Sequence, residues 1–203
     1  KDKSLPETFY VDGWIPQAFS DGQEGTKYAW LLESKFVTPG IVEDVKINCK
    51  KYFETFKYIF THNKELLDLD SRFKWCPANG YWIKDAKMYP KSKMISFITS
   101  NKNFTDGHKK RLEWVRMIGE QVDLYGRGFR EIENKEDGLC DYMFSVVIEN
   151  GFYKSYFTEK ILDCFATGTI PVYLGSPDIG DYFNKDGIID LTEEFDVSEE
   201  IYY

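Results

Sequence analysis

The stretch that decides the fold runs from residue 142 to residue 174 and reads YMFSVVIENGFYKSYFTEKILDCFATGTIPVYL. Its apolar beginning, residues 142–148, predicts a strand that is buried on both faces. Residues 158–167 carry apolar side chains at helical spacing, and residues 170–174 predict a second strand. A strand, a helix and a strand in this order are typical of a parallel sheet, because parallel strands need a crossover connection.

The same alternation continues outward from this stretch. Further strands are expected at residues 8–11, 28–32, 56–61, 94–99, 122–125 and 187–190, and further helices from residue 39 to about residue 53 and at residues 107–120. The polar and basic residues 84–93 predict a linker. We therefore expect an α/β protein with two Rossmann-like halves that face a cleft: an abbreviated N-terminal domain over residues 1–90 and a C-terminal domain over residues 91–203.

Composition narrows the class of protein. The 203 residues include 26 Lys+Arg and 34 Asp+Glu, which gives a net charge of −8 and argues against broad binding of nucleic acid. Hydrophobic residues make up 42%, which is typical of a globular chain, and no apolar run is long enough to predict a transmembrane helix. The four cysteines are far apart, so we expect buried thiols rather than a zinc ribbon or a disulfide scaffold.

The loops at the carboxyl ends of parallel strands are where open α/β sheets bind ligands. One of them leads into a predicted helix with Thr158 as its N-cap, followed by Glu159 and Lys160. Glu159 suits the positive end of the helix dipole, whereas Lys160 opposes it. An anionic ligand such as a phosphate would resolve this conflict; alternatively, Lys160 points to solvent. Glu159 could hold the hydroxyls of a sugar or ribose, or be an ordinary first-turn glutamate.

These residues resemble a known family. The segment Glu149-Asn150, the run from Tyr156 to Lys160 and residues 168–175 are similar to the donor-site motif of glycosyltransferase family 10, the α-1,3/1,4-fucosyltransferases that use GDP-fucose. The resemblance is strong over residues 94–190 and weaker over residues 26–83. The family's usual Glu-Asn-Ser reads Glu149-Asn150-Gly151 here, and the chain is short for the two-domain GT-B architecture. We therefore expect a short or truncated GT-B fold.

The resemblance also implies roles for individual residues. Donor-binding residues are expected at Asn150, Tyr156, Glu159 and Lys160, where the lysine and a helix arginine neutralise the diphosphate and the glutamate holds ribose. Arg111 is our match for that arginine, although the spacing could instead favour Lys109; Arg127 is a second candidate cation. Glu33, in a strand-end motif at residues 29–34, matches the general base. The other interpretation of Glu33 is an ordinary exposed carboxylate at a strand end.

The activity implied by the resemblance is an inverting transfer of L-fucose from GDP-fucose to a hydroxyl of a glycan acceptor. Glu33 would take the proton of the acceptor hydroxyl. Lys160, Arg111 and the helix start at Thr158 would stabilise the departing GDP, so no metal and no further cofactor are expected. Asp68-Leu69-Asp70 has the letters of a metal-binding Asp-x-Asp motif, but its polar surroundings predict a solvated turn.

Two alternatives stay open: a GT-B glycosyltransferase that uses another nucleotide sugar, and a non-catalytic relic that binds a nucleotide or a glycan. A dinucleotide-binding dehydrogenase is disfavoured, because Gly126-Arg127-Gly128 lacks the third glycine at the required spacing and the chain has no P-loop. The resemblance leaves the compartment open: the cytoplasm for a microbial or viral protein, the Golgi lumen for a fragment of a eukaryotic enzyme.

Overall fold

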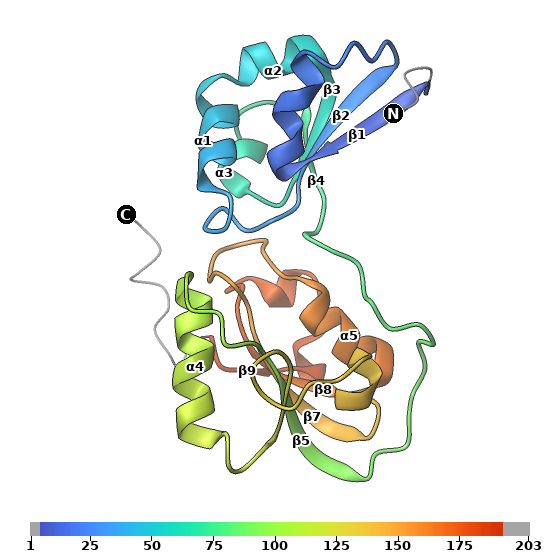
Figure 1. The fold of residues 1–203 in the computed structure, drawn as a ribbon, viewed down its shortest axis with the longest axis vertical. Helices are drawn as coiled ribbons and strands as arrows, with labels where there is room; N and C mark the ends of the chain where they lie inside the picture. The colour runs from blue at the N-terminus through green and yellow to red at the C-terminus, as the bar shows by residue number, and fades with distance from the viewer. Residues whose placement is uncertain (1–4, 193–203) are drawn as a thin grey trace. The chain divides into compact units, whose positions relative to one another are not determined.

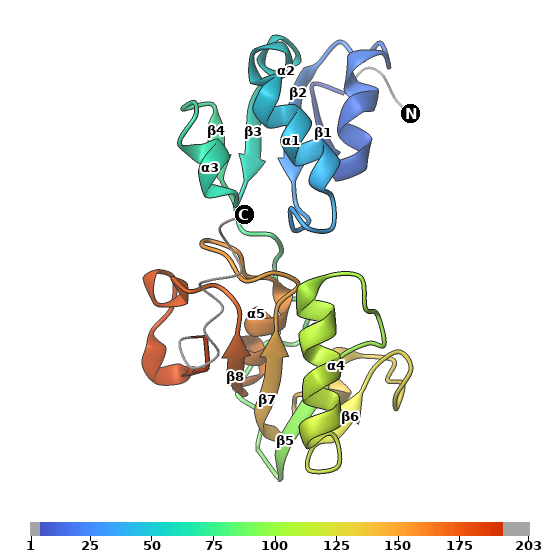
Figure 2. The same ribbon diagram turned by 90° about the vertical axis from the view of Figure 1, so that its left-hand side faces the viewer.

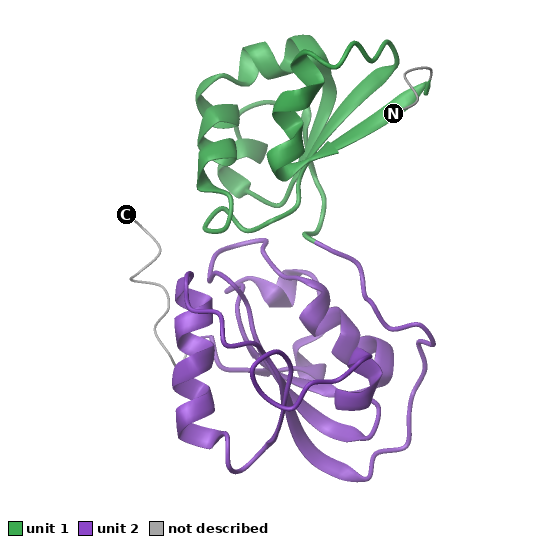
Figure 3. Ribbon diagram, in the orientation of Figure 1, with its two compact units in different colours: residues 1–78 green, residues 79–203 purple. Residues whose placement is uncertain are grey.

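The structure is a computed structural model that describes residues 5–192. The chain divides into two compact units, Lys1–Ala78 and Asn79–Tyr203 (Figure 3). Each unit has its own parallel sheet and its own apolar core. The α/β class with two sheets of parallel strands confirms the fold class expected from the sequence.

The first unit is a four-stranded parallel sheet in the order β1-β2-β3-β4. Its strands are β1 (Glu7–Val11), β2 (Thr26–Leu31), β3 (Phe56–Thr61) and β4 (Phe73–Trp75). The helical segments η1 (Asp12–Phe19), α1 (Pro39–Ile47), α2 (Cys49–Thr55) and α3 (Lys64–Leu67) gather on one face of the sheet (Figures 1 and 2). Their apolar side chains bury the inner face of β2 and β3, for example around Leu31 and Ile59.

The second unit is a five-stranded parallel sheet in the order β6-β5-β7-β8-β9. Its strands are β5 (Lys93–Ile98), β6 (Asp123–Tyr125), β7 (Tyr142–Ile148), β8 (Ile170–Leu174) and β9 (Ile189–Asp190), and its helices are α4 (Asp106–Ile118) and α5 (Glu159–Thr167), with the 3₁₀ turns η2 (Lys135–Gly138), η3 (Ile179–Asp181) and η4 (Lys185–Gly187). The chain runs from β5 through α4 to β6 on one side, and continues from β7 through α5 to β8 on the other. The strand order therefore reverses between β5 and β7.

The two helices of this unit cover opposite faces of its sheet (Figure 1). Val146 and Ile148 of β7 pack with Trp114 of α4, whereas Val147 packs with Ile161 of α5. Successive side chains of a strand point to opposite faces, which explains why β7 is apolar on both. A helix on each face of a parallel sheet is the arrangement of a Rossmann-like fold.

Residues 79–92 form no helix or strand but are fastened to the second unit. The N–H of Lys87 donates to the carbonyl of Ala166 at 2.9 Å, and Lys91 Nζ donates to the carbonyl of Thr167 at 2.8 Å. The compact units therefore separate at residue 78, earlier than the boundary that composition predicted at residue 90. The predicted linker is an extended segment with fixed contacts.

The burial of the four cysteines and the length of the helices bear on two predictions from the sequence. Cys164 is buried as expected, whereas Cys49, Cys76 and Cys140 are only half-buried, so the expectation of four buried thiols is wrong for three of them. Among residues 5–192, no helix is both long enough and apolar enough to span a membrane.

Candidate functional site

A cavity of about 190 Å³ lies in the crevice of the second unit where the strand order reverses. Ligands bind at such a switch point in open α/β sheets, because the loops diverge there and leave room above the strand ends. The cavity is lined by the end of β5 and its loop, by α4, by η2 and the residue after it, by the middle of β7 and by α5. Its charged lining consists of Arg111, Lys135, Glu159, Lys160 and Asp163.

Glu149 accepts hydrogen bonds from Thr158, the N-cap of α5. Its side chain is fully buried, and its carboxylate accepts hydrogen bonds from the N–H and from the hydroxyl of Thr158, both at 2.8 Å. A buried carboxylate is tolerated only where hydrogen bonds and charges compensate its desolvation, and the amino end of a helix supplies both. From the sequence, Glu149 was expected at a strand end within the donor-site motif, but its role in holding the start of α5 was not predicted.

Lys160 is directed toward this carboxylate. Its Nζ lies 3.4 Å from Glu149 Oε2 and donates to Thr158 Oγ1 at 2.9 Å. The conflict between Lys160 and the helix dipole is therefore relieved by an anion of the protein itself. The alternative of a lysine that points to solvent is therefore wrong, whereas the contact with an anionic ligand stays a prediction. The predicted N-cap is confirmed, since Thr158 Oγ1 accepts the N–H of Lys160.

Glu159 lies between two lysines at the cavity wall. Its Oε1 is 3.2 Å from Lys135 Nζ and 3.6 Å from Lys160 Nζ. Burial alone would raise the pKa of Glu159, but the charges of Lys160 and Lys135 outweigh it and the pKa lies below its ordinary value. Glu159 is therefore ionised at neutral pH and able to accept hydrogen bonds from hydroxyl groups.

Lys135 also pairs with Asp163, at 2.6 Å, and lies over the ring of Trp82, 4.3 Å from its centroid. Asp163 is buried and accepts the N–H of Trp82 at 2.6 Å. Neither Lys135 nor Asp163 was predicted from the sequence as a site residue. A signal existed for Asp163, because it stands four residues after Glu159 and so lies on the same helix face. Lys135 comes from a loop turn that carries no such pattern.

Arg111 reaches the same site from α4. Its guanidinium is buried, donates from Nε to the carbonyl of Ile148 at 2.7 Å and from Nη2 to Asn150 Oδ1 at 2.6 Å. Burial lowers its pKa, and the charge of Glu149 opposes that change. Lys109, the alternative match, is exposed and pairs with Asp106 at 2.9 Å. Of these two cations, Arg111 is the one that lines the cavity.

The close approach of α4 to the end of β7 depends on a glycine. A Cβ on Gly107 would lie 2.0 Å from the carbonyl oxygen of Glu149, which is far inside van der Waals contact. Glycine at this first-turn position therefore lets the helix bring Arg111 against Asn150.

Tyr156 and Arg127, which were also predicted as donor-site residues, do not line the cavity. Tyr156 is fully buried, stacks on Tyr153 with ring centroids 4.7 Å apart, and is not part of the cavity lining. Arg127 is exposed and is not part of the cavity lining. The structure thus brings together Arg111, Asn150, Glu159 and Lys160, and does not bring Arg127 into this group.

Glu33 belongs to the first unit, where it follows β2 at the carboxyl end of the sheet. Its side chain is exposed, and its N–H donates to Asp12 Oδ1 at 3.2 Å.

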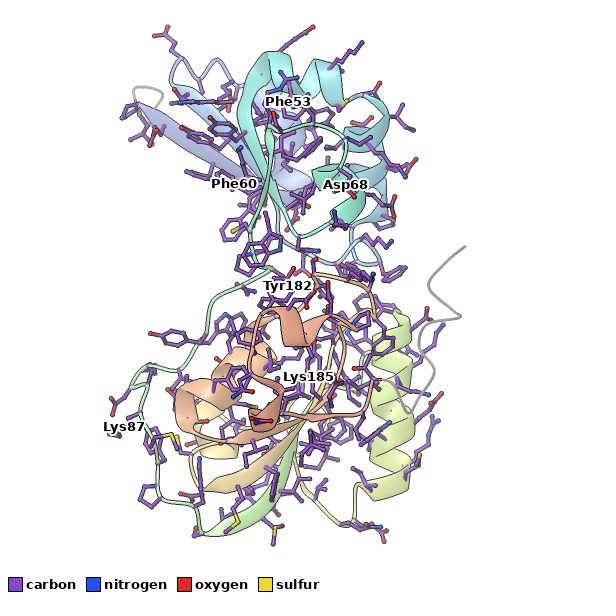
Figure 4. All side chains as sticks on the ribbon, turned by 180° about the vertical axis from the view of Figure 1, so that it is seen from behind. Phe53, Phe60, Asp68, Lys87, Tyr182 and Lys185 are labelled. Carbon is purple, nitrogen blue, oxygen red and sulfur yellow. The ribbon has the colours of Figure 1, made fainter. Side chains whose placement is uncertain are left out.

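The predicted turn at residues 68–70 is confirmed. Asp68 lies at the surface beside α3 and pairs with Lys64, and Asp70 pairs with Arg72 at 2.8 Å (Figure 4).

Comparison with known proteins identifies the family. Residues 88–201, more than half of the chain, match the family model described as glycosyltransferase family 10 (fucosyltransferase), C-terminal part. The chain belongs to glycosyltransferase family 10. The matched residues contain the whole of the cavity described above, and the family predicted from the donor-site motif is confirmed.

Family 10 relatives are similar over part of their length. The chain is 35% identical to the alpha-(1,3)-fucosyltransferase FucT of Helicobacter pylori over 72 residues, which is 36% of this chain and 15% of that protein. It is 28% identical to the human 4-galactosyl-N-acetylglucosaminide 3-alpha-L-fucosyltransferase 9 over 92 residues, 42% of this chain and 24% of that protein. The matches thus span less than a quarter of these curated relatives.

Solved structures of alpha1,3-fucosyltransferases show the same fold. A crystal structure of an alpha1,3-fucosyltransferase with GDP-fucose aligns with a TM-score of 0.59 and 18% identity, covering 98% of this chain and 78% of the other. A crystal structure with GDP aligns with a TM-score of 0.58 and 17% identity, covering 99% and 78%. The chain therefore has the GT-B fold of these structures over the part that aligns, and both of its units are represented in the alignment.

Proposed function

We propose that the chain transfers L-fucose from GDP-fucose to a hydroxyl group of a glycan acceptor, with inversion at the anomeric carbon and without a metal ion. The observation that carries this proposal is the cavity at the switch point, where Arg111, Lys160 and Glu159 converge in a chain that belongs to glycosyltransferase family 10. The fucosyltransferase names of its relatives support the same donor class.

The donor half of the reaction is assigned to the second unit. Arg111 and Lys160 face the diphosphate of the donor, and Glu159 accepts hydrogen bonds from the ribose hydroxyls. When the bond to fucose breaks, negative charge develops on the GDP oxygen, and fixed cations in a partly enclosed site stabilise that charge. Glu149 holds Lys160 in place before the donor arrives, so little reorganisation is needed during the reaction.

The acceptor half is assigned to Glu33. Its exposed carboxylate at a strand end takes the proton of the acceptor hydroxyl as that oxygen attacks the anomeric carbon. Attack from the face opposite to GDP gives inversion in one step, with no covalent intermediate on the protein.

Melting temperatures test the donor assignment. We would measure them with GDP, GDP-fucose, GDP-mannose, UDP and UDP-sugars in the absence of metal, since a ligand that binds only the folded state raises the melting temperature. Shifts with GDP and GDP-fucose, followed by transfer to 4-galactosyl-N-acetylglucosaminide, are expected. A shift with another nucleotide sugar alone would indicate a different donor, and no shift at all would indicate a non-catalytic relic.

Replacing Lys160 by alanine is expected to weaken GDP binding by about 10- to 100-fold, because a charge-assisted hydrogen bond is worth about 1.5–3 kcal/mol. Isothermal calorimetry with GDP measures the change. Lys109→Ala, which removes an exposed lysine of the same unit, is the matched control and leaves GDP affinity unchanged. Equal losses in both variants, or no loss in Lys160→Ala, would remove Lys160 from the diphosphate site.

Chelation is expected to leave the transfer rate unchanged. The proposal assigns the neutralisation of the diphosphate to Arg111 and Lys160, so a divalent cation has no step to perform. Initial rates with GDP-fucose and the acceptor are compared before and after extensive treatment with EDTA. A loss of activity that Mg²⁺ or Mn²⁺ restores would contradict the metal-independent mechanism.

A further inference from the structure

The carboxyl ends of β1 and β2 lie side by side in the first unit, because these strands are parallel and Val11 pairs with Trp30. The residue after β1 is Asp12, and β2 is followed by Leu32 and Glu33. The carboxylate of Asp12 spans the gap between the two strand ends. Its Oδ1 accepts the N–H of Leu32 at 2.9 Å and the N–H of Glu33 at 3.2 Å.

Asp12 makes these hydrogen bonds from an unusual backbone conformation. Its φ is +44°, and among residues 5–192 only Asp12 and Ser155 combine a side chain with a positive φ. Such conformations cost free energy for any residue with a Cβ, although aspartate and asparagine tolerate them better than most. They cluster at functional sites, where the surrounding structure holds them. The next residue, Gly13, has open space around it and no positive φ.

The backbone on the other side of Glu33 is also fixed. Ser34 is fully buried, its carbonyl accepts the N–H groups of Val37 and Thr38, and its hydroxyl accepts the N–H of Phe36 at 3.2 Å. His62, which is buried just beyond the end of β3, interacts with the backbone of Leu32 and Glu33. Glu33 is therefore an exposed side chain on a backbone that is held from both sides.

We propose that Asp12 is a positioning residue that directs the carboxylate of Glu33 toward the acceptor hydroxyl. This inference rests on the proposed function, in which Glu33 is the general base. A base must come within hydrogen-bond reach of the proton it removes, and a displacement of about 1 Å can cost about 100-fold in rate. Asp12 touches neither substrate; it acts through the two amide groups that it holds.

Three substitutions of Asp12 separate the effect of its hydrogen bonds on kcat from the effect of its backbone strain. Asp12→Asn keeps an oxygen that can accept both N–H groups and tolerates the positive φ. Asp12→Gly relieves the strain but removes the acceptor, and Asp12→Ala removes the acceptor and keeps the strain. Asp21→Ala is the matched control: Asp21 also accepts a backbone N–H, that of Gln23 at 3.0 Å, and pairs with Lys27, but away from Glu33.

The variants are compared with wild type by kcat and KM for transfer from GDP-fucose, by GDP-induced melting shifts and by exchange of the Leu32 and Glu33 amide protons. Asp12→Ala and Asp12→Gly are expected to lower kcat about 10- to 100-fold. Both speed exchange of the two amides and leave the KM for GDP-fucose and the GDP shift unchanged. Asp12→Asn restores kcat to near the wild-type value, and Asp21→Ala leaves kcat unchanged.

Unchanged kcat in Asp12→Ala and Asp12→Gly, with an active wild type, would overturn the positioning role and leave the proposed function standing. So would an Asp12→Asn variant as slow as Asp12→Gly, because the acceptor oxygen would then not matter. A wild-type chain that binds GDP but transfers no fucose would overturn the proposed function, and the role of Asp12 with it.

Discussion

Replacing Glu33 by glutamine is expected to lower kcat for fucosyl transfer by about 10²- to 10⁴-fold, the usual contribution of a general base. Glutamine has nearly the same shape but cannot take up the proton of the acceptor hydroxyl. Glu33 is exposed and belongs to the first unit, whereas the proposed donor site is built from the second, so the affinity for GDP stays unchanged. Initial rates and calorimetry measure the two quantities.

Glu65→Gln is the matched control for this experiment. Glu65 is an exposed glutamate of the same unit that pairs with Lys46 and Lys35, and its loss leaves kcat unchanged. If Glu33→Gln retains most of the transfer rate, another group is the base and the assignment of Glu33 is wrong. A parallel loss of GDP affinity would instead mean that the substitution disturbs the whole chain.

Replacing Glu149 by alanine is expected to destabilise the second unit by about 3 kcal/mol, because it leaves the buried N–H and hydroxyl of Thr158 without their acceptor and Lys160 without its buried partner. GDP binding is expected to fall as well, since Lys160 loses the carboxylate that orients it. Denaturant unfolding and calorimetry with GDP report the two effects.

Glu149→Gln is the milder variant, because its amide oxygen still accepts one of the two bonds from Thr158. Glu113→Gln serves as the control: Glu113 is an exposed glutamate of the same unit that pairs with Lys110. If Glu149→Ala unfolds no more easily than Glu113→Gln and binds GDP as wild type does, the proposed role of the buried carboxylate is wrong.

Much of the fold could be predicted from local patterns. The strands at residues 56–61, 142–148 and 170–174 have the predicted bounds, because β-branched and aromatic residues predominate in each of these short runs. The helix α5 begins after its predicted N-cap Thr158 and ends at Thr167, followed by the C-cap Gly168, whose φ of +68° suits glycine. These signals are local, and tertiary contacts strengthen them rather than oppose them.

Other elements could not be predicted in this way. The helix expected from residue 39 to residue 53 is broken at Asn48 into α1 and α2, and the apolar spacing is the same with or without that break. The strand β4 has only three residues, too few to show alternation, and it forms because it can pair with β3. The 3₁₀ helix η1 contains Pro16, which obscured its helical pattern.

The residues of the candidate site also include some that could be predicted from the sequence and some that could not. The family resemblance implied that Arg111, Asn150, Glu159 and Lys160 belong to one site, and the structure brings them together. The buried role of Glu149 depends on Thr158, nine residues away, and the role of Lys135 depends on a loop turn. Tertiary structure determines such partners, and no spacing pattern in the sequence predicts them.

The lysines of the cavity are paired with carboxylates of the protein itself. Lys160 contacts Glu149 and Glu159, and Lys135 contacts Glu159 and Asp163. These ion pairs fix the positions of both ammonium groups independently of any ligand. In the proposed function, the lysines therefore stay in place when GDP leaves, and the site accepts the next donor molecule without rearrangement. The arrangement favours turnover.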